Sequence, residues 1–491
     1  MLKGVLNVVV ALLALLGLLV LVLALNTWRQ GSRQVDVPPV AAIAIDEQAA
    51  AQSLSAAIQA KTVSSLDDAT LNADQFEILH RHLQSRYPQL HATLQREVVG
   101  GLSLLYTWPG SDPSAKGIML MAHQDVVPIA PGTEDRWQAE PFAGTVKEGF
   151  VWGRGSWDDK ANLISQMEAV EMLVVSGFKP KRTIYLAFGA DEEVGGGRGA
   201  KAIVKLLKQR NVKLDFIIDE GLLITEGVLP GLKPAGAIIG IAEKGYVSLQ
   251  LSVTAPPGHS SMPPAKGTSA IAMMSAALKE LDEQQLPAHI RGVARQMFQT
   301  VAPEMSGFSR VALSNLWLFG PVVQKQLEAG ASTNAMLRTT TALTIVNAGI
   351  KDNVLPGLAE ATVNFRLLPG DTQATVVEHA KQVIANDKVT LKVSIASEAS
   401  KVAPTDSASY KLIERTVREL FPGTIVAPGL MVAGTDSKHF EDICDHIYKF
   451  SPVRAKPEDL SRFHGTNERI STANLAELIR FYHRLLSQGA A

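Results

Sequence analysis

The hydrophobic positions of this chain fall into stretches of different period, and the first stretch stands apart. Residues 5–25 are apolar except for Asn7, with Lys3 before them and Arg29 after them. A helix of that length crosses a bilayer core of roughly 30 Å. Because the segment is longer than a signal-peptide core and no small-residue cleavage site follows it, we expect residues 1–28 to be a membrane anchor. Cleavage as a signal peptide is the alternative.

The position of this segment also bears on where the protein resides. A single apolar segment at the very N-terminus, with Lys3 on its inner side, favours export of the body to the periplasmic or extracellular side. If the segment is cleaved, the protein is secreted instead. Residues 29–45 contain Gly31, Ser32 and two prolines, and we expect them to form a linker.

After the linker, helical periodicity alternates with short, continuous apolar runs. Residues 46–95 have helical spacing, and apolar runs follow at 117–122, 183–188 and 214–218, separated by further helical patterns. This α/β alternation predicts a mostly parallel sheet with helices on both faces. We assign residues 46–243 to the first part of this main domain.

The next stretch has a different character. Residues 246–253, 339–346 and 361–367 alternate between apolar and polar positions, as in strands with one exposed face. Residues 244–372 are therefore predicted to form an inserted α+β unit. Helix and strand patterns alternate again afterwards, so we expect residues 373–491 to complete the main domain.

Composition narrows the classes of function. The formal net charge of −1 gives no sign of a nucleic-acid surface. Cys444 is the only cysteine, which excludes an intramolecular disulfide and a thiolate metal cluster. Hydrophobic residues make up 46% of the chain, enough for sizeable cores.

Metal-capable side chains follow the apolar runs. His123 and Asp125 come after the first, Glu192 and Glu193 after the second, and Asp219 ends the third. An isolated acidic turn is usually only a solvated loop, but sites in such sheets form beyond the carboxyl ends of the strands. Imidazole and carboxylate groups in this number exceed the needs of one zinc ion and suit a pair of metals. The candidate group consists of His123, Asp125, Asp158, Glu192, Glu193, Asp219 and His464.

Five stretches carry a resemblance to a known family. Their order resembles that of the M20 metallopeptidases, and it is closest to the branch that contains carboxypeptidase S and the N-acyl amino acid hydrolase/synthases. The resemblance covers nearly everything after residue 46. The stretches are MLMAHQDVVP (119–128), WGRGSWDDK (152–160), DEEVGG (191–196), DEG (219–221) and FHGTN (463–467).

The resemblance implies a role for each residue of the group. It makes Asp158 the carboxylate that bridges two Zn²⁺ ions, with Co²⁺ or Mn²⁺ as other options. Asp125 would orient His123, and Glu192 would be the general base. Relatives place a ligand at either position of Asp219-Glu220, and we expect Asp219. The implied metal ligands are His123, Asp158, Glu193, Asp219 and His464.

The resemblance extends to the inserted unit, which would be a lid or dimerisation domain. His259 matches a lid histidine that helps to hold the transition-state oxyanion, often across a homodimer. Asn353 and Arg366 match positions that bind the carboxylate of the substrate, a task suited to a guanidinium. Gly434 matches a loop that offers backbone N–H groups to the same carboxylate. Read without the family, His259 is a turn residue and Arg366 a partner in a structural ion pair.

The function implied is hydrolysis of an amide bond by a water that bridges two metals. The substrate would be a small molecule with a free carboxylate, either a dipeptide or a fatty N-acyl amino acid. A different class of function is a non-catalytic binding protein on a degenerate peptidase fold. That alternative needs missing ligands or a missing base, and the sequence retains all of them.

Overall fold

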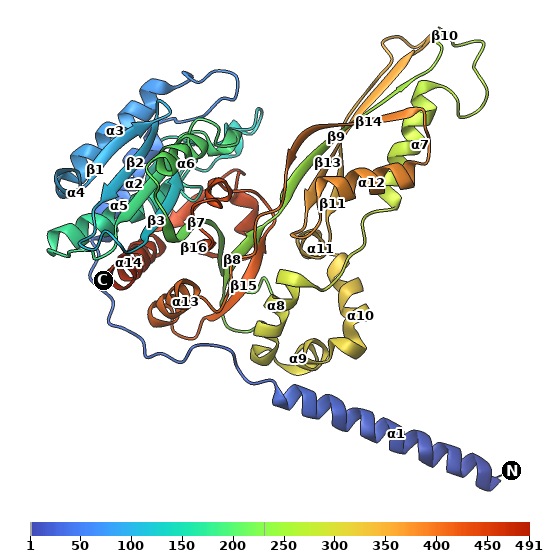
Figure 1. Cartoon of the computed structure of the whole chain (residues 1–491), viewed down its shortest axis with the longest axis horizontal. Helices are drawn as coiled ribbons and strands as arrows, with labels where there is room; N and C mark the ends of the chain where they lie inside the picture. Colours follow the sequence, from blue (N-terminus) through green and yellow to red (C-terminus); the bar gives the residue numbers. More distant parts are fainter. Residues whose placement is uncertain (1, 230) are drawn as a thin grey trace.

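The computed structural model describes residues 2–229 and 231–491. Its elements form a main domain, a lid that projects from it and a long N-terminal helix, α1, that points away from both (Figure 1). Helix α1 covers Leu2–Arg29. Among the described residues it is the one helix long and apolar enough to cross a membrane, and a window of 18 of its residues has a mean hydropathy of 3.3. An anchor and a signal peptide both have these properties.

The main domain is built on a mixed, mostly parallel sheet with the strand order β1-β2-β6-β3-β7-β16-β8-β15. Strand β3 runs parallel to both β6 and β7, so their carboxyl ends share one edge of the sheet. This confirms the predicted fold class. In sheet order the strands are β1 (Gln95–Val99), β2 (Ser103–Trp108), β6 (Ile184–Gly189), β3 (Gly117–His123), β7 (Leu214–Thr225), β16 (Ile447–Ala455), β8 (Gly236–Glu243) and β15 (Ile425–Met431).

Helices cover both faces of this sheet, which explains why its strands are continuously apolar. In β3, Ile118 and Leu120 face a core shared with α5 and α14, while Met119 and Met121 face a second core shared with α6. The helices of the main domain are α2 (Glu47–Gln59), α3 (Ala73–Arg86), α4 (Pro88–Thr93), α5 (Lys160–Val175), α6 (Ala200–Gln209), α13 (Ala408–Leu420) and α14 (Thr472–Gly489).

The lid is an antiparallel sheet with the order β11-β13-β9-β14. Helices α7 and α12 pack on its apolar face. Because β14 pairs with β9, the lid continues beyond the predicted boundary at residue 372. A helix followed by a strand has the same sequence pattern in either domain, so the pattern alone could not place this boundary. The elements are β9 (Gly245–Thr254), α7 (Ala270–Glu283), β11 (Thr340–Ala348), β13 (Leu358–Leu367), α12 (Gln373–Ile384) and β14 (Val389–Ser397).

A cluster of short helices lies between the lid and the end of α1 (Figure 1). Met297 and Phe298 of α8 share a core with Ile425 and Ala427 of the edge strand β15. The inserted segment therefore packs on the main sheet as well as forming the lid. The helices are α8 (Gly292–Val301), α9 (Gly307–Ser314), α10 (Leu316–Glu328) and α11 (Ala331–Leu337).

Candidate metal centre

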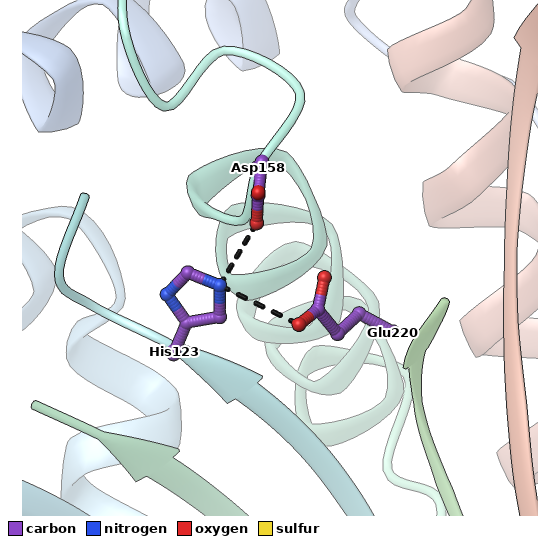
Figure 2. Close-up of side chains that lie close together, drawn as sticks. All are labelled: His123, Asp158 and Glu220. Carbon is purple, nitrogen blue, oxygen red and sulfur yellow. Dashed lines mark hydrogen bonds and ion pairs between the residues drawn. The ribbon is translucent and has the colours of Figure 1, made fainter. Parts of the chain in front are cut away.

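Strand β3 ends at His123, whose imidazole is buried at the carboxyl edge of the main sheet. Its Nε2 atom lies 2.9 Å from Oδ1 of Asp158 and 3.6 Å from Oε1 of Glu220 (Figure 2). The other ring nitrogen, Nδ1, donates to the carbonyl oxygen of Asp125 over 2.9 Å. That bond fixes the ring so that Nε2 faces the two carboxylates.

A second group shares Asp158 with the first. Its Oδ2 atom lies 2.8 Å from Nε2 of His464, and the same nitrogen lies 3.4 Å from Oε1 of Glu193. In each group the three ligand atoms lie within 4.8 Å of one another. The structure thus brings His123, Asp158, Glu193 and His464 together as predicted, from four separate stretches of sequence.

The loop that carries Asp158 is held by a buried carboxylate that the sequence interpretation did not single out. Glu468 accepts hydrogen bonds from the backbone N–H groups of Trp157, at 2.8 Å, and Asp158, at 3.1 Å. It also forms a 2.6 Å ion pair with Arg154. Arg154 in turn donates to the carbonyl oxygen of His464, so one ion pair fastens both metal-capable loops. The sequence contained one indication of this role, because Glu468 lies four residues after His464.

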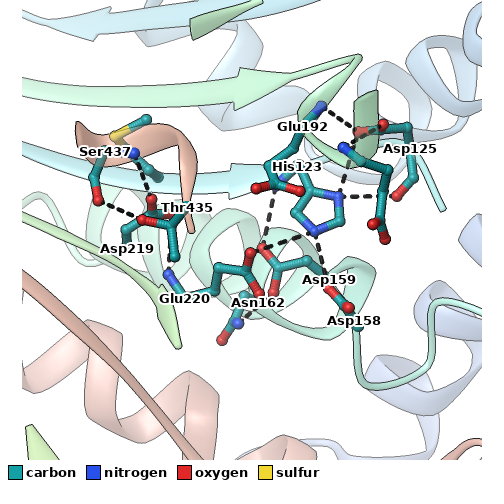
Figure 3. Close-up of polar contacts among 12 residues, drawn as sticks. His123, Asp125, Asp158, Asp159, Asn162, Glu192, Asp219, Glu220, Thr435 and Ser437 are labelled. Atoms are coloured by element: carbon teal, nitrogen blue, oxygen red, sulfur yellow. Dashed lines mark hydrogen bonds and ion pairs between the residues drawn. The ribbon is translucent and has the colours of Figure 1, made fainter. Parts of the chain in front are cut away.

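Asp125 links His123 to the two glutamates. Its Oδ1 and Oδ2 atoms accept from the backbone N–H groups of Glu192, at 3.2 Å, and Glu193, at 3.1 Å (Figure 3). The hydroxyl of Ser64 donates to Oδ2 over 2.7 Å. Asp125 therefore sets the position of the short helix η2 (Glu192–Val194) relative to the imidazole.

The geometry favours Glu220 over the predicted Asp219 as a ligand. Both carboxylate oxygens of Asp219 already accept backbone hydrogen bonds, from the N–H of Ser437 at 2.9 Å and from that of Glu220 at 3.0 Å. Glu220 instead faces His123 and Asp158. The reason lies in local chain direction: β7 continues through this dipeptide, and adjacent strand residues point to opposite sides. Sequence alone could not say which of the two points inward.

Burial and mutual repulsion govern the ionisation of these groups. Burial, with repulsion from Asp436, raises the pKa of Glu192 well above its usual value. Burial, with the charge of Asp158, does the same to the pKa of Glu220. A hydrogen bond to Asp158 raises the pKa of His464 to about 10. A buried surplus of carboxylates around two imidazoles is a charge pattern that divalent cations neutralise, and the donor set of nitrogen and oxygen fits zinc, cobalt or manganese.

Asp436 is a second buried acid that the sequence interpretation passed over. A Cβ atom at Gly189 would lie 2.4 Å from its Oδ2, and one at Gly196 would lie 2.1 Å from its Oδ1. Only glycine at these two positions lets the carboxylate approach the turn that carries Glu192. The sequence contained an indication that Asp436 belongs to the site, because this residue directly follows the Gly434 loop.

The site residues predicted in the lid do not join the metal-capable groups of the main domain. His259 and Asn353 are exposed, and the short strand β10 (Gly258–His259) lies at the far tip of the lid (Figure 1). Arg366 stacks on the ring of Tyr246, with 4.6 Å from its guanidinium carbon to the ring centroid. In the part of the chain that the structure describes, no hydrogen bond or ion pair joins these three residues to the metal-capable groups. Gly434 lies in the loop that follows β15, two residues before Asp436, whose carboxylate approaches Gly189.

Comparison with known proteins decides the family. Residues 119–488 match the sequence profile of peptidase family M20/M25/M40. The chain belongs to this family. It is accordingly a hydrolase of the metallopeptidase type, which confirms the resemblance drawn from the five motifs.

Named relatives of two kinds align with most of this chain. The N-fatty-acyl-amino acid synthase/hydrolase PM20D1 of Xenopus tropicalis is 40% identical over 439 residues, covering 89% of this chain and 85% of the relative. The probable carboxypeptidase S-like 2 of Dictyostelium discoideum is 39% identical over 483 residues, covering 96% and 92%. Both kinds of protein in the branch named from the motifs are thus represented.

Solved structures of the family share the fold. The M20 family metallo-carboxypeptidase Sso-CP2 from Sulfolobus solfataricus aligns with a TM-score of 0.63 at 15% identity, covering 90% of this chain and 99% of that one. Human carnosine dipeptidase 1 aligns with a TM-score of 0.62 at 16% identity, covering 90% and 96%. At these identities the likeness concerns the fold.

Proposed function

We propose that the chain hydrolyses the amide bond of N-acyl amino acids or peptides that carry a free carboxylate, with two divalent metal ions at the carboxyl edge of the main sheet. The observation that carries this proposal is that two groups of ligand atoms share Asp158. His123 and Glu220 would hold one ion, His464 and Glu193 the other, and Asp158 both. When bound, such ions polarise the scissile carbonyl and lower the pKa of water.

Glu192 is the proposed general base. It is adjacent to Glu193 in η2, and its backbone is held by Asp125, so its carboxylate lies beside the metal-capable groups. A carboxylate beside the metal ligands is placed to take the proton of the attacking water. Glu192 takes a proton from the attacking water as oxygen bonds to the carbonyl carbon. It then delivers that proton to the amine nitrogen as the carbon–nitrogen bond breaks.

The lid residues are proposed to bind the rest of the substrate. Arg366 and Asn353 would hold the carboxylate, together with backbone N–H groups of the Gly434 loop, and His259 would donate to the developing oxyanion. Because His259 lies at the tip of the lid, we further propose that a second copy of the chain supplies it in a homodimer. Its imidazole is exposed and hydrogen-bonded to Ser261 at 2.8 Å, so it is accessible to another chain.

The class of acyl group separates two versions of this function. One relative is named for fatty N-acyl amino acids and another for carboxypeptidase action. The deciding experiment measures hydrolysis of N-acyl amino acids with short and long chains beside dipeptides, using the metal-loaded full chain. Turnover of at least one class supports the proposal. Absence of turnover on every member, with metal bound, would favour the rival function of a non-catalytic binding protein.

The N-terminal segment is proposed to anchor the enzyme in a membrane with its body exported. Its length and hydropathy support this, and so do side-chain contacts between its last turns and the body. A protein that starts at the first residue after isolation from membranes supports anchoring. A mature protein that begins near residue 29 would show that the segment is a cleaved signal and that the enzyme is secreted.

A further inference from the structure

The last turns of α1 are held by the corner between α9 and α10. Asn315, at this corner, is completely buried. Its Nδ2 atom donates to the carbonyl oxygen of Leu23 at 3.3 Å and to the hydroxyl of Thr27 at 3.1 Å. Its Oδ1 atom accepts from Nδ2 of Asn26 at 3.1 Å. A side chain from the middle of the chain thus meets α1 where its apolar segment ends.

The same corner exposes large apolar side chains. Trp317 donates from Nε1 to Oδ1 of Asn315 over 3.2 Å, so its indole lies one side chain away from α1. Residues 316–323, the first part of α10, are apolar, whereas the later part carries Gln324 and Lys325. The exposed apolar side chains at the corner are Phe308 (68%), Trp317 (59%), Leu318 (38%) and Val322 (65%), and Trp28 (78%) is exposed at the end of α1.

Hydrogen bonds hold the linker after α1 against the main domain. Gln34 makes two hydrogen bonds to the backbone of Val426 on β15, at 2.8 Å to its carbonyl oxygen and 2.7 Å from its N–H. Arg418 of α13 donates to the carbonyl oxygen of Val35 at 3.3 Å. The body is therefore fastened to α1 at both the α9–α10 corner and the main sheet, which gives the two a defined relative orientation.

We infer that the α9–α10 corner is a second membrane contact, seated in the interfacial layer of the bilayer that α1 spans. The inference rests on the proposed anchor. If α1 spans, the end of its apolar segment marks the membrane surface, and hydrogen bonds hold the corner at that level. Tryptophan is enriched at this depth because its ring is apolar while its N–H is polar. Arg29 and Lys325 flank the corner with positive charge suited to lipid headgroups.

The experiment places a fluorophore on single cysteines in the full chain, reconstituted in phosphatidylcholine/phosphatidylglycerol vesicles. Cys444 is replaced by alanine, and the labels go on Trp317→Cys or Val322→Cys, two exposed positions. Quenching by lipids that carry a spin label just below the headgroup is then measured. Leu13→Cys, read with lipids that carry the spin label near the end of the acyl chain, reports whether α1 inserts. Val175→Cys, at the exposed end of α5 in the main domain, is the aqueous control.

We expect labels at 317 and 322 to show blue-shifted emission and strong loss of fluorescence with the quenching lipid, and the label at 175 to show neither. Labels at 317 and 322 that behave like 175 while the label at 13 is quenched would overturn the second contact and leave the anchor standing. A blue shift without lipid quenching would mean that another copy of the chain covers the corner, which also overturns the inference. Absence of quenching at 13 would remove the anchor and, with it, this contact.

Discussion

The carboxyl edge of the main sheet and the tip of the lid carry residues of the same predicted site in opposite settings. At the sheet edge, His123 and Asp158 are buried and lie within hydrogen-bond distance of each other. At the lid tip, His259 is exposed, and its imidazole is hydrogen-bonded to the hydroxyl and the backbone N–H of Ser261. The edge is assembled by the fold of one chain. If His259 acts as proposed, a second chain or a movement of the lid has to bring it to the metal-capable groups.

The largest effect is expected at the sheet edge. Glu192→Gln keeps the shape of the side chain and the backbone bonds to Asp125 but removes the base, so kcat should fall by about 10²–10⁴-fold with metal still bound. Glu97→Gln, which removes a half-buried acid paired with Arg210, is the matched control and should leave kcat unchanged. Activity near that of wild type in a metal-loaded Glu192→Gln enzyme would end the assignment of this base.

The lid tip can be tested by complementation. His259→Ala should lower kcat by about 10²–10³-fold, since one oxyanion donor is lost. If His259 acts across a homodimer, mixing inactive His259→Ala and Glu192→Gln chains should restore roughly a quarter of wild-type activity, because half of the dimers are mixed and each has one complete site. Dimers that exchange subunits without recovering activity would place His259 in its own chain's site, and monomers would exclude the trans arrangement.

The ion pair beneath the edge should matter for stability. Glu468→Gln keeps an acceptor for the backbone of Trp157 but leaves the buried Arg154 unpaired, which should cost about 3–5 kcal/mol in the free energy of unfolding. Burial raises the pKa of Glu468 in spite of Arg154. The loss of stability therefore comes mainly from leaving the buried Arg154 guanidinium without a carboxylate, not from losing a strong attraction between the two residues. Denaturant unfolding measures it. Replacing both residues with methionine should not recover the loss, because the backbone N–H groups of Trp157 and Asp158 and the carbonyl oxygen of His464 then lose their partners. A double variant as stable as the wild type would contradict this account.

A smaller effect distinguishes the two acids of β7. Glu220→Gln should remove one metal ion from each chain. Asp219→Asn changes a side chain that holds the backbone of Glu220 and Ser437, so it should only weaken metal affinity, by about 10–100-fold. Titration with metal, followed by mass spectrometry of the intact protein, measures the number of bound ions and their affinity in both variants. If Asp219→Asn loses the ion and Glu220→Gln retains it, the ligand is Asp219 as the motif first suggested.

The sequence predicts the sheet edge better than the lid for a physical reason. The run ending at His123 and the run before Glu192 are adjacent parallel strands, so their carboxyl ends had to meet. Which of Asp219 and Glu220 faces inward depends on the local direction of β7, which no pattern records. Glu468 and Asp436 escaped notice because their roles depend on contacts with loops far away in sequence. The lid boundary was misplaced because α12 and β14 have the same pattern in an antiparallel sheet as in a parallel one.

The central claim is that the buried carboxylates and imidazoles at the sheet edge hold two metal ions. The most direct test is the metal content of the full-length enzyme, purified at neutral pH without chelator and measured by plasma mass spectrometry. We predict about two equivalents of zinc, cobalt or manganese per chain, falling in Asp158→Asn because both groups share that residue. Near-zero metal in the folded wild-type protein, even after incubation with these ions, would contradict the account.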